Sequence, residues 1–424
     1  MVVGQGSTGA ALTASDIEQV IATAGEALLV GERDPTGKRV LVIIPDATRT
    51  APIPLLFRLL HAQLGRRAAQ LDYLIALGTH PPLPPEAIDR LVGVAAAERA
   101  ERYPNVRIFN HDWDRPEMLR RVGVIARAEA DELSGGLLAA EVPVTLNRLI
   151  FDYDLLLICG PVFPHEVAGF SGGAKYLFPG IAGPDIINFT HWLGALVTSM
   201  PTIGVKDTPV RRVITRAAEL VPRPMVYVGL VMRGADPHGI YVGPLAEAWS
   251  QAADLSARLN ITYLDRPVRR VLSAPAEMYD DLWTAAKAMY KTEPVIEDGG
   301  EVIIYAPHIT EVSYTHGKLI DAVGYHVRDY FLKQWDRFRD VPGTILAHST
   351  HVKGTGTYDA ALGIETPRIT VTLATGIPEE RCRRINLGYT DALAIDPAAW
   401  QGREQDGILY VSHAGERLYR LRGA

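Results

Sequence analysis

Short apolar segments alternate with longer amphipathic segments along most of this 424-residue chain. Continuous apolar runs at Val40–Ile44, Tyr73–Leu77 and Leu155–Cys159 end at polar residues or glycine, which is typical of buried parallel strands. Helical spacing of the apolar positions predicts helices over Pro54–Leu64 and Pro84–Ala97. Because strands and helices alternate, the pattern indicates an α/β fold with parallel-rich sheets.

The same alternation continues to the end of the chain and suggests a division into two domains. We place the boundary near residue 267, so that residues 1–267 form the larger domain and residues 268–424 a smaller α/β domain. The elements expected around and after the boundary are strands at Met225–Val231, Val268–Leu272, Glu301–Tyr305 and Ile369–Leu373, and helices at Leu245–Leu259, Asp281–Lys291 and Leu319–Trp335.

Composition and charge narrow the class of protein. Hydrophobic residues make up 47% of the chain and charged residues 22%, which is ordinary for a globular protein. The net charge of −6 provides no general attraction to nucleic acid or to anionic lipid. No apolar run is long enough for a spanning helix, and the first residues do not resemble a signal peptide. We therefore expect a cytoplasmic protein that has neither nucleic acid nor a membrane as a partner.

The two cysteines, Cys159 and Cys382, are too few for a disulfide scaffold or a zinc ribbon. Cys159 falls within an apolar strand and is interpreted as an inert core thiol.

The densest chemical signal is the glycine-rich stretch between Gly160 and Gly194, which contains His165, Lys175 and His191. Glycines after a strand allow positive φ and close approach of the backbone to a ligand, often one that carries phosphate. The plainer interpretation is a glycine-rich connection with a solvated lysine and two core histidines. Composition alone leaves both interpretations open.

Two further fragments follow strand ends, where α/β proteins keep their active sites. Asp46-Ala47-Thr48-Arg49 follows the first apolar run, and Gly78-Thr79-His80 follows the second. Each fragment alone is a weak signal, because Asp and Thr also cap helices and a single histidine is usually structural. Together with the histidines of the glycine-rich stretch, they suggest acid/base catalysis or metal binding.

Other histidine and glycine patterns receive a structural interpretation. Gly4–Gly9 formally matches G-x-G-x-x-G, but no strand precedes it, so we expect a flexible N-terminal segment. His348 and His351 are expected at the surface or in a turn. His308 and His316 flank Glu311 and are expected to form a structural polar cluster.

Three motifs together resemble the nickel-dependent lactate racemase family. They are Asp46-Ala47-Thr48-Arg49, Ala76-Leu77-Gly78-Thr79-His80, and Gly169-Phe170-Ser171-Gly172-Gly173-Ala174-Lys175, the last preceded by His165. The order and spacing of His165, Lys175 and His191 also match that family. The resemblance implies two α/β domains with the active site in the cleft between them, the smaller domain closing over the substrate.

The resemblance also implies a cofactor, the nickel-pincer nucleotide (pyridinium-3,5-bisthiocarboxylic acid mononucleotide nickel). Lys175 matches the lysine that tethers this nucleotide, and His191 matches the protein ligand of nickel. Gly172 and Gly173 belong to the loop that surrounds it. Proteins that synthesise the cofactor would be needed as partners for the holo form.

Further positions match residues that handle a small 2-hydroxy acid substrate in that family. His80 and His165 match the two acid/base residues, and Arg49, supported by Asp46, matches the group that binds the carboxylate. Lys287 resembles the lysine of the smaller domain that closes onto the substrate. The position corresponding to a substrate-contacting glutamine holds Thr284, and Trp335 is a looser match to a tryptophan of that domain.

Departures from the family pattern concern the substrate more than the cofactor. Pro81-Pro82-Leu83 replaces the usual Arg-Pro-Met, Val167 stands where an aromatic residue is common, and Thr284 replaces glutamine. We therefore expect a racemase or epimerase that inverts the C2 carbinol of a 2-hydroxy acid that need not be lactate. Two alternatives stay open: a conventional histidine-ligated metalloenzyme, acting as a hydro-lyase or hydrolase, and a non-catalytic protein that binds a hydroxy acid or a nucleotide.

Overall fold

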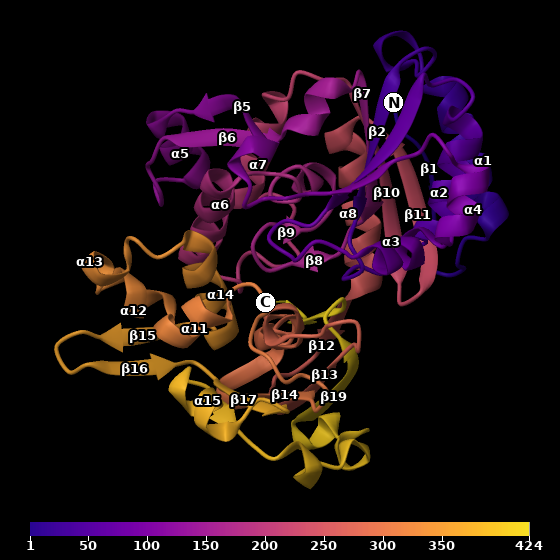
Figure 1. Ribbon diagram of the computed structural model, residues 1–424. Coiled ribbons are helices and arrows are strands. Elements are labelled where there is room, and N and C mark those ends of the chain that lie inside the picture. The colour runs from indigo at the N-terminus through magenta and orange to yellow at the C-terminus, as the bar shows by residue number, and fades with distance from the viewer. Residues whose placement is uncertain (424) are drawn as a thin grey trace.

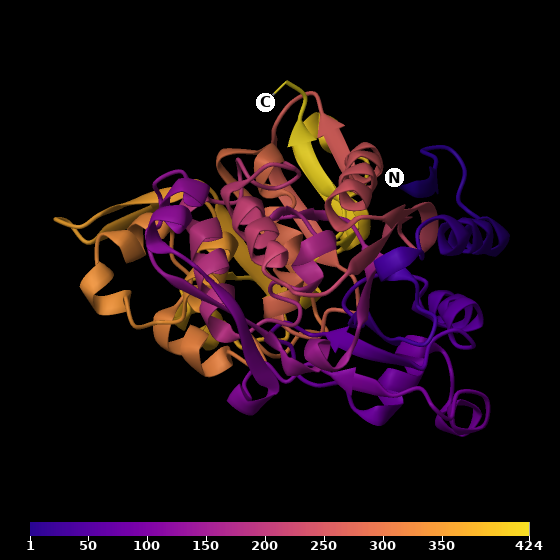
Figure 2. The same cartoon turned by 90° about the horizontal axis from the view of Figure 1, so that it is seen from above.

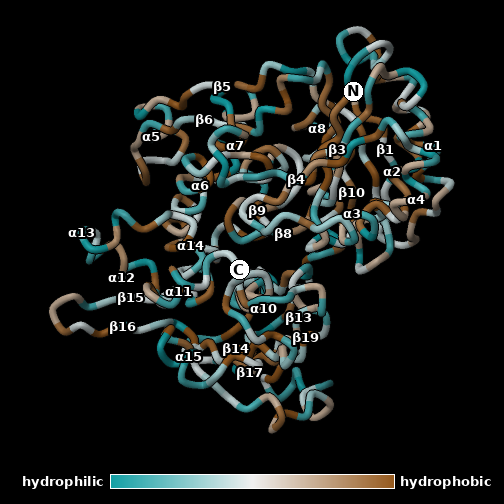
Figure 3. The backbone as a smooth tube through the Cα atoms, viewed as in Figure 1, coloured by the Kyte–Doolittle hydropathy of each residue, from teal (hydrophilic) through white to brown (hydrophobic). Residues whose placement is uncertain are grey.

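Two parallel-rich sheets organise the chain, one in the upper part of Figure 1 and one in the lower part. The structure is a computed structural model and describes residues 1–423. The expected α/β class is confirmed. Hydrophobic residues are concentrated along the strands of both sheets (Figure 3).

The upper sheet has seven strands in the order β1-β11-β10-β7-β2-β3-β4. The five strands from β10 to β4 are mutually parallel. At the other edge, β11 pairs antiparallel with β10, and β1 pairs antiparallel with β11. The strands are β1 (Val3–Gly6), β2 (Arg39–Pro45), β3 (Gln70–Ala76), β4 (Ile108–Asn110), β7 (Leu155–Pro161), β10 (Met225–Arg233) and β11 (Asp236–Gly243).

Helices cover both faces of this sheet, which explains why its central strands β2 and β7 have apolar residues facing both sides. In β2, Val40 and Val42 belong to one core, and Leu41 and Ile43 belong to the other. One face is covered by α1 (Ala14–Ala27), α2 (Ile53–Leu64) and α3 (Pro85–Val92), with α4 (Ala96–Arg102) following α3. The other is covered by α6 (Pro184–Val197), α7 (Pro209–Glu219) and α8 (Leu245–Asn260).

Smaller elements complete the upper part. A two-stranded sheet of β5 (Leu119–Ile125) and β6 (Val142–Asn147) lies beside α5 (Arg127–Ser134) in Figure 1. The glycine-rich stretch folds as a short hairpin of β8 (Pro164–His165) and β9 (Gly169–Phe170), followed by a 3-10 turn at Gly173–Tyr176.

The lower sheet has five strands, all parallel, in the order β18-β17-β14-β13-β19. The strands are β13 (Val268–Pro275), β14 (Ile296–Ala306), β17 (Thr370–Thr375), β18 (Gly388–Tyr389) and β19 (Ile408–Ala414). The helices are α9 (Leu282–Ala285), α10 (Lys287–Tyr290), α11 (Gly317–Val323), α12 (Arg328–Leu332), α13 (Trp335–Phe338), α14 (Gly343–Lys353) and α15 (Glu379–Arg384). A hairpin of β15 (Gly356–Asp359) and β16 (Ile364–Pro367) projects from this part.

The chain passes between the two parts twice. After α8 it forms β12 (Ile261–Leu264) and then enters the lower sheet at β13. After β19 it returns as β20 (Leu418–Leu421), which pairs parallel with β12. Figure 2 shows this yellow strand lying alongside β12.

Three of the expected local structures are wrong. The helix expected over Pro84–Ala97 ends at Val92, where Gly93 takes a positive φ, and α4 begins at Ala96. Residues 3–6 of the supposedly flexible N-terminus form β1, an edge strand paired with β11. A Cβ on Gly4 or Gly6 would lie within 2.5 Å of the Tyr241 ring or hydroxyl, so these glycines let the edge strand pack over that side chain. The helix expected over Leu319–Trp335 is two short helices, α11 and α12, because Gly324 takes a positive φ between them.

Cys159 is buried in β7, as expected for a core thiol, and burial raises the pKa of that thiol to about 12. Among residues 1–423, no helix is both long enough and apolar enough to cross a membrane.

Candidate functional site

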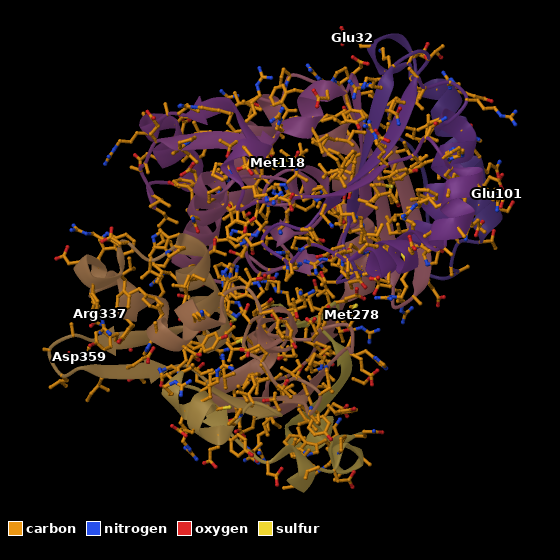
Figure 4. All side chains as sticks on the ribbon, viewed as in Figure 1. Glu32, Glu101, Met118, Met278, Arg337 and Asp359 are labelled. Atoms are coloured by element: carbon orange, nitrogen blue, oxygen red, sulfur yellow. The ribbon has the colours of Figure 1, made fainter. Side chains whose placement is uncertain are left out.

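One cavity collects most of the residues singled out in the sequence. Figure 4 shows the side chains of both parts meeting between the two sheets. The cavity is lined from both parts and has a volume of about 160 Å³. Its lining includes Asp46, Arg49, His80, His165, Lys175 and His191 from the upper part. Thr284 and Lys287 line it from the lower part.

The loops after β2 and β3 form a carboxylate–histidine pair at one wall. His80 Nδ1 lies 2.5 Å from Asp46 Oδ2. The other carboxylate oxygen, Asp46 Oδ1, accepts hydrogen bonds from the Thr48 amide at 3.1 Å and the Thr48 hydroxyl at 2.7 Å. Burial alone would raise the pKa of Asp46, but the charges of His80 and Arg49 and these hydrogen bonds hold it well below its usual range. Asp46 is therefore ionised, and its Oδ2 accepts the proton that His80 carries on Nδ1, which fixes the orientation of the ring.

His165, on β8, has the opposite arrangement of ring nitrogens. The Val167 amide donates to Nδ1 at 3.1 Å, so the neutral ring carries its proton on Nε2. Burial, together with the charges of Lys175 and Arg49, pulls the pKa of His165 well below its ordinary value. The Glu166 carboxylate lies 3.4 Å from the same Nδ1. His165 is thus a neutral hydrogen-bond donor with a carboxylate beside it.

Lys175 lies on the 3-10 turn that follows Gly172. Burial and the charge of Arg49 lower the pKa of its amine to about 7, so a substantial part of it is the uncharged, nucleophilic form near neutral pH. A Cβ on Gly172 would lie 2.5 Å from the Tyr227 hydroxyl, and one on Gly173 would lie 2.9 Å from the Trp249 ring. These glycines therefore let the loop pack closely on the protein beneath it, while Gly172 also borders the cavity.

His191 projects from α6 with its orientation held by the helix itself. Its Nδ1 donates to the Ile187 carbonyl at 2.7 Å, which leaves the Nε2 lone pair free. Burial and the charge of Lys175 lower the pKa of His191 to about 4, so the ring is neutral. A neutral imidazole whose second nitrogen donates to a carbonyl is the usual form of a histidine metal ligand.

The lower part contributes Lys287 and Thr284 to the wall of the cavity. Lys287 Nζ donates to the Thr284 carbonyl at 3.1 Å and lies 4.5 Å from the centre of the Tyr279 ring. Burial and the charge of Arg49 lower the pKa of Lys287 to about 7. The hydroxyl of Thr284 bonds to Asp281 Oδ1 at 2.8 Å, within the N-terminal cap of α9.

Trp335 lies outside this cavity, so the structure does not bring it to the substrate position expected from the resemblance. Its ring stacks on Trp192, with centroids 5.4 Å apart, and the side chain is 38% exposed. It borders a separate surface groove between α6 and α13. In the sequence, the spacing of Trp335 from the other motifs differs from the spacing in the family pattern, and this difference was the signal that could have predicted its position.

His348 and His351 are not surface or turn residues; that expectation is wrong. Both lie on α14, are no more than 9% exposed and line the cavity. The helix packs against α6 and is buried on nearly all sides. His348 stacks on the Trp283 ring at 4.0 Å, and its Nε2 lies 3.2 Å from the Tyr325 hydroxyl. The spacing of three residues within a helix was the signal that could have placed both on one face.

Two residues of the polar cluster around Glu311, namely Glu311 itself and His308, make only structural contacts. Glu311 bonds to Arg381 at 2.6 Å, and His308 Nε2 lies 3.1 Å from the Tyr279 carbonyl. His316 instead reaches the loop that carries His80, with its Nε2 3.1 Å from the Thr79 hydroxyl. This contact joins the two parts of the chain next to the cavity.

Within residues 1–423, no group of three or more His, Cys, Asp or Glu side chains is arranged to hold a metal ion. The alternative of a conventional metalloenzyme with His80, His165 and His191 as a joint ligand set therefore gains no support from the geometry.

Comparison with known proteins gives the wider context. Residues 13–204 match the family model described as the lactate racemase N-terminal domain. Lactate racemases from Thermoanaerobacterium thermosaccharolyticum and Lactiplantibacillus plantarum are each 24% identical, over 63% and 64% of this chain respectively. The alignments span 60% of the length of these two relatives.

Solved structures extend the similarity to nearly the whole chain. A Thermotoga maritima protein is 33% identical and superposes with a TM-score of 0.89, covering 98% of this chain and 99% of that one. The lactate racemase apoprotein from T. thermosaccharolyticum has the same fold, with 20% identity, a TM-score of 0.71 and coverage of 96% of this chain and 92% of that one. Residues 13–204 of this chain thus match the lactate racemase N-terminal domain, and the chain as a whole has the fold of the lactate racemase apoprotein.

Proposed function

We propose that this protein is an isomerase that inverts the C2 carbinol of a 2-hydroxy acid by reversible hydride transfer to a nickel-pincer nucleotide. The observation that carries the proposal is the single cavity lined by His80 and His165 together with Arg49, Lys175 and His191. The names of the two curated relatives support racemase chemistry. The altered residues around the cavity support a substrate other than lactate.

The residues present fit such a nucleotide. The amine of Lys175, whose pKa is lowered to about 7, is chemically suited to a covalent link. The free Nε2 of His191 is suited to a metal already held by three other donors. When bound, the nucleotide would supply an electrophilic carbon that accepts the C2 hydride and returns it. We assign Lys175 as the tether and His191 as the only protein side chain on nickel.

The substrate carboxylate would be held by cations from both parts of the chain. Arg49 presents a planar guanidinium suited to two parallel hydrogen bonds with a carboxylate. Lys287 approaches from the lower part, which supports a role for residues 268–424 in closing over the substrate. An anion beside both groups would also favour the charged form of Lys287, whose amine is largely desolvated in the cavity.

His80 and His165 would both exchange a proton with the substrate oxygen, but their ring protons start on different nitrogens. His80 donates its Nδ1–H to Asp46, so that the neutral form of the ring has its lone pair on Nε2 and would accept the hydroxyl proton there. His165 begins as a donor through Nε2 and can act as an acid once its ring takes up a second proton. That proton requires a new acceptor at Nδ1, and the Glu166 carboxylate at 3.4 Å is placed to receive it.

The experiment uses protein co-expressed with the cofactor-synthesis proteins and a panel of chiral 2-hydroxy acids deuterated at C2. Chiral chromatography measures loss of optical purity, and mass spectrometry measures deuterium at C2. We expect inversion with deuterium retained, because the hydride does not exchange with water. Inversion with washout of deuterium would overturn hydride transfer, and no inversion of any acid by nickel-loaded protein would overturn the racemase assignment. Protein expressed without the synthesis proteins is the matched control.

A further inference from the structure

His351 is the most unusual polar side chain of the cavity. It is 3% exposed, and neither ring nitrogen has a hydrogen-bond partner in the described part of the chain. It lines the same cavity as His165 and His191. Leaving a buried donor or acceptor without a partner is unfavourable, so a ring with two such nitrogens calls for a ligand that satisfies them.

The chemistry of the ring restricts that ligand. Burial lowers the pKa of His351 to about 4, against a smaller opposing effect of the Glu166 carboxylate. The ring is therefore neutral and offers one N–H donor and one nitrogen acceptor. A hydroxyl group, which both donates and accepts, matches either nitrogen of such a ring.

Other ligand groups fit less well. The ionised Glu166 carboxylate, whose charge acts on His351, would repel a second carboxylate placed against this ring. An ammonium group would meet the repulsion of Arg49 and Lys287, which line the same cavity. An apolar group would leave both ring nitrogens unsatisfied.

We infer that His351 forms a hydroxyl-recognition subsite and that the substrate is a 2-hydroxy acid with at least one further hydroxyl on C3 or C4. The inference rests on the proposed function and specifies its substrate class. Lactate, with only a methyl group beyond C2, would leave the subsite unused. The ribose of a bound nucleotide is the other source of hydroxyl groups, and the test separates the two sources.

The test compares acids that differ by one hydroxyl group: glycerate with lactate, and 2,4-dihydroxybutanoate with 2-hydroxybutanoate. Holo-protein is assayed for kcat/KM of C2 inversion, for binding by calorimetry, and for nickel and nucleotide content. We expect the wild type to prefer one hydroxylated acid over its partner by about 10- to 100-fold. His351→Leu should reduce that ratio to near one, and His351→Gln, which keeps a donor and an acceptor, should restore part of it.

Thr350→Val is the matched control. Thr350 lies next to His351 on α14, is 3% exposed and also has an unpartnered side-chain oxygen, but it does not line the cavity. The substitution should leave the substrate ratio unchanged. Thermal melting of each variant checks that α14 is still folded.

The outcomes separate this inference from the proposed function. A wild type that inverts 2-hydroxy acids without any preference for the extra hydroxyl, or a ratio unchanged in His351→Leu, overturns the subsite and leaves the racemase assignment in place. Loss of nucleotide from His351→Leu at an unchanged ratio assigns the ring to the ribose and also overturns the substrate inference. If nothing is inverted but calorimetry shows a preference for hydroxylated acids that depends on His351, the subsite stands and the proposed function fails.

Discussion

Replacing Asp46 by asparagine tests whether the carboxylate sets the proton position on His80. The side chain keeps its shape but loses its charge and gains an N–H₂ group. Asp46 Oδ1 accepts two hydrogen bonds from Thr48, so the amide oxygen of the variant should stay on that side. The N–H₂ group then faces His80 Nδ1, which lies 2.5 Å from Asp46 Oδ2 in the wild type. His80 Nδ1 would have to accept, and the ring proton would move to Nε2.

The expected loss follows from that change. A hydrogen bond to a charged group contributes about 1.5–3 kcal/mol, which corresponds to roughly 10- to 150-fold in rate. Placing the proton on the nitrogen that should accept adds to this loss, since a comparable Asp-to-Asn change in a serine protease lowers kcat by about 10⁴. We expect kcat for C2 inversion to fall by about 10²- to 10⁴-fold, with nickel content unchanged.

Two measurements check the reasoning. Chiral chromatography follows inversion from each enantiomer, and ¹⁵N NMR of histidine-labelled protein reports which ring nitrogen of His80 is protonated. Thr48→Val is the control, because it removes one hydrogen bond to Asp46 and keeps the carboxylate; its loss should stay below about tenfold. A His80 ring already protonated at Nε2 in the wild type, or an Asp46→Asn variant of full activity, would refute the argument.

Three other predictions concern attachment, packing and pH. Peptide mass spectrometry of holo-protein should find the nucleotide on Lys175, and Lys175→Ala should lack it; an active enzyme with unmodified Lys175 would contradict the tether. Gly169→Ala should destabilise the fold by about 2–4 kcal/mol, because φ is +77° and the new Cβ would lie 1.8 Å from the Val205 carbonyl oxygen. Gly31→Ala is the control, because Gly31 also has a positive φ (+59°) but a Cβ there would meet no atom within 4 Å; this variant should lower the free energy of unfolding by less. Thermal and denaturant unfolding measure both variants. In cofactor-free protein, burial lowers the pKa of Lys287 from 10.5 to about 7. Between pH 7 and pH 10.5 the unfolded chain therefore binds more protons at this lysine than the folded chain does, so the free energy of unfolding should rise with pH in that range. The melting temperature of Lys287→Met should rise less steeply with pH than that of the wild type over pH 7–9.5. Equal slopes for the two proteins would contradict the lowered pKa of Lys287.

The strands and strand-end loops of the upper sheet could be predicted because their signals are local. Val40–Ile44 is apolar on both faces since helices cover both faces of the sheet, and Asp46 follows it at the edge where α/β proteins bind ligands. The same logic placed His80 correctly after β3. Roles beyond position came from the family resemblance and stay predictions for each residue.

Features that depend on distant packing could not be predicted. His351 lies far from His191 in sequence, and only the packing of α14 on α6 brings them to one cavity. Gly4 looked like part of a flexible segment because nothing nearby in sequence reveals Tyr241 or the free edge of β11. Trp335 was matched by residue type, whereas its position is determined by stacking on Trp192.

Because the chain returns as β20, two backbone segments connect the two parts instead of a single linker. One crossing lies between β12 and β13, and the other lies between β19 and β20. Two parallel connections allow rotation about the line that joins them and oppose twisting about any other axis. The second crossing also carries Glu416, whose carboxylate accepts from the Thr50 amide and whose carbonyl accepts from Lys291. Any opening of the cavity about this double connection would therefore be directional, and it would pull on the loop that holds Arg49.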